Sequence, residues 1–269
     1  MMPPDAREAG VEDEAFWRDF LTEGHRGERA ARRLLKHLPD SPRCKACAAP
    51  FAGLGAPVMR AVGKGPSKSN PNLCNSCFSY MRKHRGGAEI EISLLFADVR
   101  GSTSLAERMT TTEYHALMER FYRVAARAVF GNDGGVDKFV GDEVMAMFFP
   151  LASGDDHPAK AIAAAKDLLR ATGHADPSGP WLPMGAGVHT GRAWVGALGD
   201  ETHVELTALG DAVNVAARLA AAAGPGEIIV SMAAARLAHI EGGLDRRTLE
   251  LKGKVDPIEV VILRVGRDG

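Results

Sequence analysis

From residue 89 onward, the pattern of apolar and polar positions predicts a mixed α/β domain. Residues 88–99 (AEIEISLLFADV) alternate and then become continuously apolar, as a strand does when it enters a buried sheet. Residues 111–130 repeat apolar side chains at helical spacing. The pattern continues with a hairpin over 136–149, a helix around 156–172, strands over 183–195 and near 203–207, a helix over 211–223, the strand GEIIVS and a final hairpin. The order β-α-β-β-α-β plus additions predicts an α+β sandwich of the ferredoxin-like type.

The first 88 residues follow a different pattern. Residues 13–38 have helical periodicity, and Gly24 and Gly27 are expected to divide them into two helices. Residues 82–87 (RKHRGG) have the composition of a linker. The sequence therefore predicts four segments: a helical segment over 1–40, a cysteine-rich module over 41–81, a linker over 82–88 and the α/β domain over 89–265.

Composition and charge narrow the class of protein. The chain is 45% hydrophobic and 25% charged, as in globular proteins, and has no apolar run long enough to cross a bilayer. Its first residues carry acids and prolines rather than the features of a signal peptide, so the expected compartment is the cytoplasm. The net charge of -1 divides into +6 for residues 1–88 and -7 for residues 89–269. Two differently built halves are therefore expected.

All four cysteines lie in two CxxC pairs, Cys44 with Cys47 and Cys74 with Cys77. Four thiolates in two such pairs are typical of a structural Zn²⁺ site in a zinc-ribbon-like module. An iron–sulfur cluster and four unrelated thiols remain alternatives, whereas disulfides are not expected in a reducing compartment. The surrounding basic residues could face an acidic partner or nucleic acid. Because aromatic residues for base stacking are scarce there, a structural or docking role is favoured over nucleic-acid binding.

Two acids in the α/β domain follow or precede predicted strands. Asp98 ends a buried strand, and Asp142 lies in the Gly-Asp turn of the 136–149 hairpin. If these strands are neighbours, the two carboxylates converge and repel, and a divalent cation such as Mg²⁺ would relieve that repulsion. Ser104 and Glu107 have the spacing of a capping box. The amides of Gly101, Ser102 and Thr103 before it would then form an anion site suited to phosphate.

Five motifs occur in a specific order: FADVRGST, DKFVGDEV, GVHTGRAWVG, LTALGDAVNVAARL and LELKGK. In this order and spacing, residues 89–264 resemble the class III nucleotidyl cyclases. The resemblance implies an adenylate cyclase that converts ATP to 3′,5′-cyclic AMP and pyrophosphate. It also implies that Asp98 and Asp142, assisted by the Val99 carbonyl, hold two Mg²⁺ (or Mn²⁺) ions per active site. One departure from many family members is Ser102, which stands where an aromatic residue often precedes the Thr.

The same resemblance assigns four further side chains. Arg218 matches the Arg that neutralises charge on the α-phosphoryl group, and Asn214 matches the Asn that orients the ribose. Lys138 and Thr207 match the pair that reads adenine. Lys only donates hydrogen bonds, and adenine N1 accepts one whereas guanine N1 carries a proton, so this pair favours ATP. Since family sites combine residues of two catalytic domains, the single domain here implies a homodimer with shared active sites.

Other functions remain open at this stage. They are a guanylate cyclase, a non-catalytic nucleotide-binding signalling module, and a zinc-dependent nucleic-acid binder whose cyclase-like part only dimerises. For the cysteine module we hypothesise that it fixes the relative pose of the two protomers.

Overall fold

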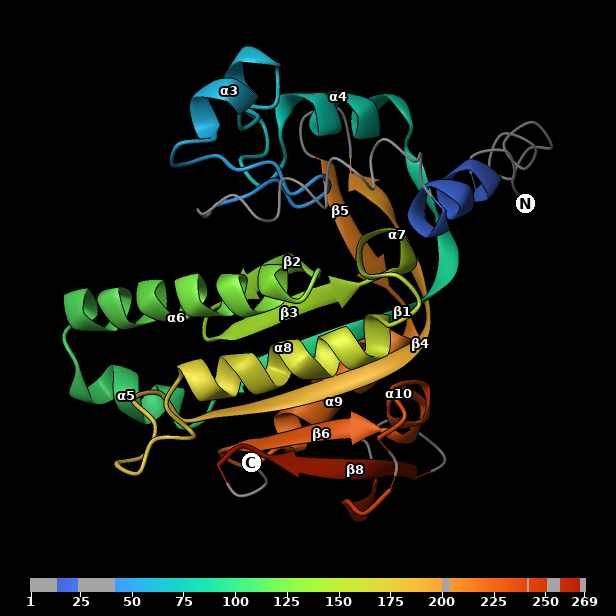
Figure 1. The fold of residues 1–269 in the computed structure, drawn as a ribbon. Coiled ribbons are helices and arrows are strands. Elements are labelled where there is room, and N and C mark those ends of the chain that lie inside the picture. The colour runs from blue at the N-terminus through green and yellow to red at the C-terminus, as the bar shows by residue number, and fades with distance from the viewer. Residues whose placement is uncertain (1–13, 24–41, 200–203, 241, 251–256, 267–269) are drawn as a thin grey trace. The chain divides into compact units, whose positions relative to one another are not determined.

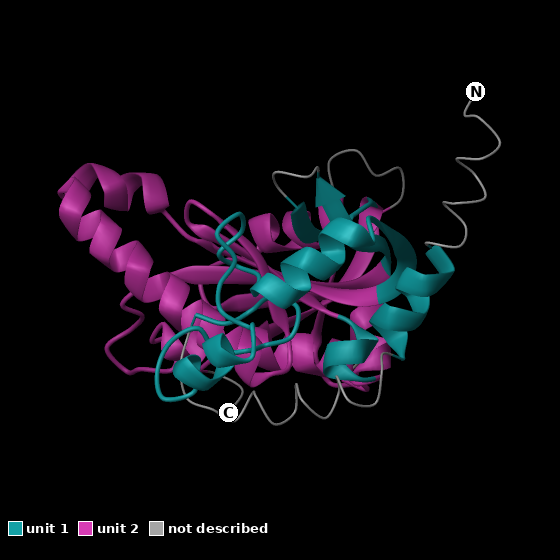
Figure 2. Ribbon diagram, turned by 90° about the horizontal axis from the view of Figure 1, so that it is seen from above, with its two compact units in different colours: residues 1–91, 149–154, 192–210 teal, residues 92–148, 155–191, 211–269 magenta. Residues whose placement is uncertain are grey.

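The computed structural model describes residues 14–23, 42–199, 204–240, 242–250 and 257–266. They form two compact units, coloured separately in Figure 2. Unit 1 contains residues 1–91, 149–154 and 192–210, and unit 2 contains residues 92–148, 155–191 and 211–269. Each unit is therefore described by itself. No helix among the described residues is long and apolar enough to span a membrane.

Unit 2 is built on a sheet whose strand order is β2-β3-β1-β4-β6-β8-β7. The part β4-β1-β3-β2 is the order of a ferredoxin-like sandwich, so the predicted fold class is confirmed. β3 is antiparallel to both β1 and β2, and β6 runs parallel to β4. The strands are β1 (Gly86–Val99), β2 (Gly135–Val140), β3 (Glu143–Phe148), β4 (Met184–Gly199), β6 (Glu227–Ser231), β7 (Asp245–Leu249) and β8 (Ile258–Arg264).

Helices cover both faces of this sheet, which explains the continuously apolar strands. In β6, Ile228 and Val230 face the main core, whereas Ile229 between them joins a second cluster with Leu219 of α9. The alternation is that of a strand buried on both faces. Figure 1 shows α6 and α8 side by side. The helices of unit 2 are α5 (Ser102–Arg108), α6 (Thr111–Gly131), α8 (His157–Ala171), α9 (Asp211–Ala222) and α10 (Met232–Leu237).

Unit 1 joins the cysteine module to a hairpin of the α/β domain. It contains α3 (Ala56–Ala61), α4 (Asn75–Lys83), α7 (Pro150–Ser153), the ends of β1 and β4, and β5 (Val204–Leu209), which pairs antiparallel with β4. The buried Asn70 side chain donates a hydrogen bond to the Val204 carbonyl, with 2.9 Å between Nδ2 and O. α4 also packs against β5. The module is thus attached to β5 by a buried polar contact and by packing.

A helix over residues 14–22 belongs to the same unit, and aromatic rings connect it to α4. Phe16 stacks on His84 with 5.3 Å between ring centroids, and Phe20 lies 5.8 Å from Tyr80. Trp17 is fully buried beside them. The first of the two expected N-terminal helices is therefore present, while the second lies outside the described residues.

Two local expectations are wrong. The proposed linker over 82–88 is mostly regular structure, because α4 continues to Lys83 and β1 already begins at Gly86. The expected capping box at Ser104 does not form, because α5 begins two residues earlier, at Ser102. Gly101 there adopts the left-handed conformation (φ 72°), which glycine tolerates without a Cβ clash. A capping box occurs instead at the start of α6, between Thr110 and Glu113.

Gly187 allows α9 to lie directly on β4. A Cβ atom at this position would collide with the backbone of α9 at Ala220 and would lie 2.7 Å from the Ala216 carbonyl oxygen. Any side chain at residue 187 would therefore push α9 away from the sheet. The position of α9, and of the side chains that it carries, depends on this glycine.

A buried histidine predicts that unit 2 loses stability in mild acid. His157 Nδ1 lies 2.8 Å from Ser93 Oγ, which in turn lies 2.6 Å from Thr190 Oγ1. Burial lowers the pKa of His157 from 6.5 to about 4. Between these values the unfolded chain binds a proton that the folded chain does not. Stability is therefore complete above pH 6.5 and falls as the pH drops toward 4, by about 2 kcal/mol at pH 5.

Urea unfolding at pH 7.5 and pH 5 checks this prediction. The His157→Asn variant should lose less stability than wild type on this pH change, by roughly that 2 kcal/mol. His115→Gln, which changes an exposed histidine of α6, is the matched control and should keep the wild-type pH dependence. Equal pH dependence of wild type and His157→Asn would contradict the assignment.

Candidate active site

Two acids meet where β1 ends beside the β2–β3 turn. The antiparallel pairing of β1 with β3 sets Asp98 opposite Glu143, so Asp98 lies next to the Gly141–Asp142 turn. The Val99 amide donates to the Asp142 carbonyl, with 3.3 Å between N and O. Burial, together with the charge of Asp142 and against that of Arg100, raises the pKa of Asp98. The expected convergence of the two carboxyls is confirmed by this geometry.

A third carboxyl, that of Glu143, belongs to the same group. It is partly buried, and burial followed by the charges of Asp98 and Asp142 raises the pKa of Glu143. The acids Asp98, Asp142 and Glu143 together form a site of concentrated negative charge, which a divalent cation would stabilise. Oxygen ligands of this kind are those that Mg²⁺ and Mn²⁺ prefer.

Arg100 is a functional candidate that the sequence motifs did not reveal. Its Nη2 lies 2.8 Å from Asp98 Oδ2, and its Nε lies 3.3 Å from the Asp98 carbonyl oxygen. Both side chains are largely buried. The positive charge of the Arg100 guanidinium offsets part of the repulsion among the acids, and its hydrogen bonds fix the orientation of the Asp98 carboxylate.

The turn that carries Asp142 is supported from α6. Tyr122 donates a hydrogen bond to the Gly141 carbonyl, with 2.6 Å between the oxygens. The Tyr122 ring stacks on Phe139 of β2 at 4.1 Å between centroids. Gly141 itself has φ 60°, the left-handed conformation that a tight turn requires. Tyr122 was not predicted, since only the fold brings α6 to this turn.

The candidate phosphate-binding residues lie at the start of α5. Gly101 is the residue before the helix, and Ser102 and Thr103 are its first two residues. No side chain caps this helix end. The helix thus begins at Ser102 and not after Ser104, and the use of these amides as an anion site stays a prediction.

The remaining candidates lie on three different elements. Asn214 and Arg218, one turn apart on α9, are on the side opposite its buried residues, and among the described residues neither side chain forms a hydrogen bond or ion pair. Lys138 is on β2 in unit 2, with its Nζ 3.9 Å from Asp137 Oδ2. Thr207 is buried on β5 in unit 1, opposite Gly196.

The family model for the adenylate and guanylate cyclase catalytic domain matches residues 87–264. This chain belongs to that family. The match covers all the candidate residues above and leaves the cysteine module outside. The five motifs and the strand order therefore identify the family correctly.

Known cyclases with similar sequences cover about half of this chain. Adenylate cyclase 1 of Rhizobium meliloti is 31% identical over 134 residues, which is 48% of this chain and 20% of that protein. The adenylate cyclase of Anabaena cylindrica is 30% identical over 138 residues, 48% of this chain and 26% of that protein. The chain thus matches only a minor part of the length of these relatives.

Solved cyclase structures extend the similarity over the fold. The guanylyl cyclase Cya2 superposes with a TM-score of 0.61 at 26% identity and covers 68% of this chain and 96% of its own. The adenylyl cyclase CyaB from P. aeruginosa superposes with a TM-score of 0.57 at 28% identity and covers 68% of this chain and 98% of its own. Proteins named for either nucleotide thus share this fold.

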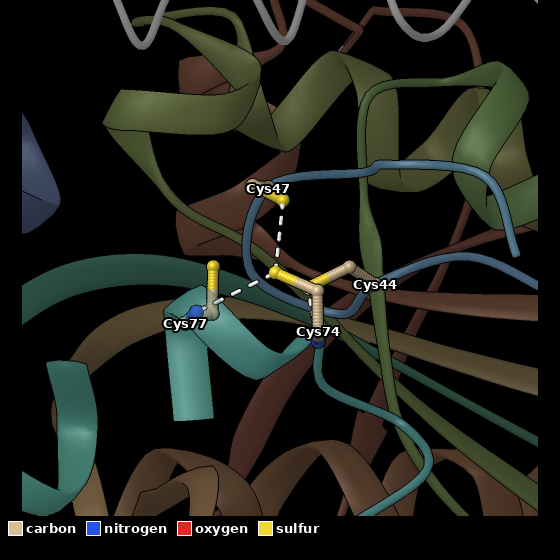
Figure 3. A group of neighbouring side chains, drawn as sticks. All are labelled: Cys44, Cys47, Cys74 and Cys77. Atoms are coloured by element: carbon tan, nitrogen blue, oxygen red, sulfur yellow. Dashed lines mark hydrogen bonds between the residues drawn. The ribbon is translucent and has the colours of Figure 1, made fainter. Parts of the chain in front are cut away.

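Outside the cyclase domain, the four cysteines converge as the sequence predicted. The sulfur atoms of Cys44, Cys47, Cys74 and Cys77 all lie within 4.8 Å of one another (Figure 3). Cys47 and Cys74 are 3.8 Å apart. A tetrahedral Zn²⁺ with Zn–S bonds of about 2.3 Å separates its sulfurs by about 3.8 Å, so the four ligands fit a single zinc ion.

Backbone amides and a lysine lie beside the sulfur atoms of this cluster. The Cys74 amide donates to Cys44 Sγ at 3.2 Å, and the Cys77 amide donates to Cys74 Sγ at 3.4 Å. Lys64 Nζ lies 3.9 Å from Cys47 Sγ. Although burial acts in the opposite direction, the neighbouring thiolates raise the pKa of Lys64. The module therefore offers a binding environment for a cation with four thiolate ligands.

Proposed function

We propose that this chain is an adenylate cyclase, which converts ATP to 3′,5′-cyclic AMP and pyrophosphate. The observation that carries the proposal is the pair of acids, Asp98 and Asp142, at the end of β1 within a cyclase-family domain. In the reaction the ribose 3′-oxygen bonds to the α-phosphorus as the bond to pyrophosphate breaks, and the hydroxyl proton is released to water.

The acids are the metal-binding part of the proposed site. Asp98, Asp142 and the Val99 carbonyl would hold two Mg²⁺ or Mn²⁺ ions. When bound, such ions lower the pKa of the 3′-hydroxyl and neutralise the triphosphate. Tyr122 and Arg100 keep the two carboxylates in place, through the Gly141 carbonyl and the Asp98 side chain respectively.

The other residues act on the nucleotide. The amides of Gly101, Ser102 and Thr103 would donate hydrogen bonds to the phosphate oxygens. Arg218 would donate to the α-phosphoryl oxygens, where negative charge increases, and Asn214 would orient the ribose.

The site is proposed to be shared between two copies of the chain. Asn214 and Arg218 have no intramolecular partner among the described residues and face away from the core, so they are available to a second protomer. Exposed apolar side chains at Val140, Leu198 and Leu209 are further candidates for burial in such a dimer. Two equivalent sites would follow from the two-fold symmetry.

We assign structural Zn²⁺ to the cysteine module. We also assign the protein to the cytoplasm, because four cysteines that form no disulfide suit a reducing compartment. The sulfur separations support one ion with four ligands. Metal analysis of purified protein should give one zinc per chain, and iron in its place would contradict the assignment.

Purified protein given equal ATP and GTP, with Mg²⁺ or Mn²⁺, tests the main proposal. Mass spectrometry should find cyclic AMP as the dominant product. Predominant cyclic GMP would make the protein a guanylate cyclase. Nucleotide binding without either product would make it a binding module.

Lys138 is predicted to set the choice of base. A Glu at this position only accepts hydrogen bonds. It could not bond to adenine N1, which is also an acceptor, but it could accept from the N–H groups of guanine. Lys138→Glu should lower kcat/KM for ATP roughly tenfold to a hundredfold and lower the preference for ATP over GTP.

Competition assays with both nucleotides check this change. Lys166→Glu, which makes the same charge reversal on α8, is the control and should keep the wild-type preference. An unchanged ratio of cyclic AMP to cyclic GMP in Lys138→Glu would show that the base is selected elsewhere.

A further inference from the structure

Arg100 connects two elements of unit 2 that lie far apart in the sequence. On one side its Nη2 is 2.8 Å from Asp98 Oδ2. On the other side its Nη1 is 3.2 Å from the Ala221 carbonyl oxygen, and its Nη2 is 3.2 Å from that of Ala220. The backbone amide of Arg100 donates to the Pro183 carbonyl at 2.8 Å, which fixes the base of the side chain.

This arrangement uses properties that only arginine has. The last carbonyls of a helix lack intrahelical partners, and a cation near them is also favoured by the helix dipole. Ala220 and Ala221 lie in the last turn of α9, so Arg100 stabilises that end. Its planar fork supplies donors to Asp98 and to the helix at once, whereas the single ammonium of lysine cannot reach all these acceptors.

The connected helix carries the side chains proposed to act on the substrate. Asn214 and Arg218 precede the Arg100 contacts on α9, and Gly187 holds the same helix against β4. A shift at the end of α9 would therefore displace Arg218, and small displacements of a catalytic group have large effects on rate.

We infer that Arg100 is a positioning residue that links the metal-binding half of one active site to the helix serving the other site of the homodimer. The inference rests on the proposed shared site, in which Asp98 and Arg218 of one chain act in different sites. Arg100 then acts on catalysis twice, once through Asp98 and once through α9.

Heterodimers with one working site separate the two actions. One protomer carries Asp142→Ala, which removes its metal half but leaves Asp98 and α9. The other carries Arg218→Ala, which removes the α9 half. The single working site combines the acids of the second protomer with Asn214 and Arg218 of the first. Arg100→Gln is then added to either protomer, and the pairs are purified through two different affinity tags.

With Arg100→Gln on the protomer that supplies α9, kcat should fall about tenfold while the Mg²⁺ dependence of the rate stays unchanged. With Arg100→Gln on the protomer that supplies the acids, the Mg²⁺ dependence should change. Compared with Arg100→Gln, the Arg100→Lys change should restore the wild-type Mg²⁺ dependence more fully than it restores kcat. Arg108→Gln, an exposed arginine at the end of α5, should affect neither.

An effect confined to the acid-supplying protomer would overturn the inference, because Arg100 would then serve Asp98 alone. No effect in either arrangement would overturn it as well. If the heterodimers lacking any Arg100 change are inactive, the shared site itself fails.

Hydrogen exchange tests the contact between Arg100 and α9 without a measurement of the cyclase rate. In the Arg100→Gln homodimer, amides in α9 should exchange several-fold faster than in wild type, and Mn²⁺ should protect α9 in wild type but not in the variant. Circular dichroism confirms that the variant is folded, and Arg100→Lys replaces it if it is not. Equal exchange of α9 in both proteins would overturn the inference whatever the heterodimers show.

Discussion

Asp98→Ala should lower the cyclase rate by about a thousandfold, and mixing it with Arg218→Ala should restore activity. The first change removes a carboxylate that the structure holds beside Asp142, and the second removes the cation proposed for the α-phosphoryl group. Each variant alone lacks one half of both sites. A heterodimer regains one complete site, because each protomer supplies the half that the other has lost.

The size of the recovery follows from random pairing. An equal mixture contains one half heterodimers, each with one of two sites intact, so the rate should reach about a quarter of wild type. The mixture must be incubated long enough for subunits to exchange. Glu119→Ala, an exposed acid on α6, controls for loss of charge and should keep full activity.

Two outcomes would count against this prediction. No recovery at any mixing ratio, with both variants dimeric and folded, would exclude the shared site. A fully active Asp98→Ala variant would exclude the acid pair as the metal site. Asp98→Asn adds a test with nearly unchanged shape, since it keeps an acceptor for Arg100 but loses the charge.

The element order and the acid pair could be predicted from the sequence because both depend on local patterns. Apolar residues repeat every second residue in a strand and about every 3.6 residues in a helix. These repeats, like the Gly-Asp turn, can be recognised within short stretches of the sequence. The approach of Asp98 to Asp142 then needs only the assumption that β1 and the hairpin are neighbours. The paired cysteines carry an equally local signal.

The unpredicted features depend on contacts between distant parts of the chain. Arg100 reaches Ala221, and Asn70 reaches Val204, and neither pair leaves a periodic trace in the sequence. The start of α5 was predicted wrongly for a local reason. A capping box was expected at Ser104, but the helix begins at Ser102, directly after Gly101 in the left-handed conformation.

Replacing Cys44 and Cys74 by serine should remove the zinc and unfold the cysteine module. A site with four thiolates supplies much of the folding free energy of so small a module, on the order of 10 kcal/mol for structural zinc. The bound zinc should fall from one per chain to none. The module should then become sensitive to proteases.

The same double variant should also impair catalysis, because the module is attached to the strand that carries Thr207. Asn70 donates its buried hydrogen bond to Val204, three residues before Thr207 on β5. Without the folded module, β5 loses this contact and the packing of α4. KM for ATP should therefore rise several-fold, and the dimer should dissociate at a higher protein concentration than wild type.

A second variant separates the effect of zinc loss from the effect of losing the Asn70 hydrogen bond to β5. Asn70→Ala should keep one zinc per chain but leave the Val204 carbonyl without its buried donor, which costs about 1–3 kcal/mol. It should reproduce the rise in KM while the metal content stays normal. Ser69→Ala, an exposed change in the same loop, should have no effect.

The next measurements show whether the cysteine module holds β5 in place or has no effect on the cyclase domain. Zinc analysis, analytical ultracentrifugation and ATP kinetics are made on the three variants and wild type together. If the zinc-free protein keeps the wild-type KM and oligomer mass, the module has no part in shaping β5. If Asn70→Ala alone leaves KM unchanged, the packing of α4 rather than the Asn70 hydrogen bond holds β5 in place.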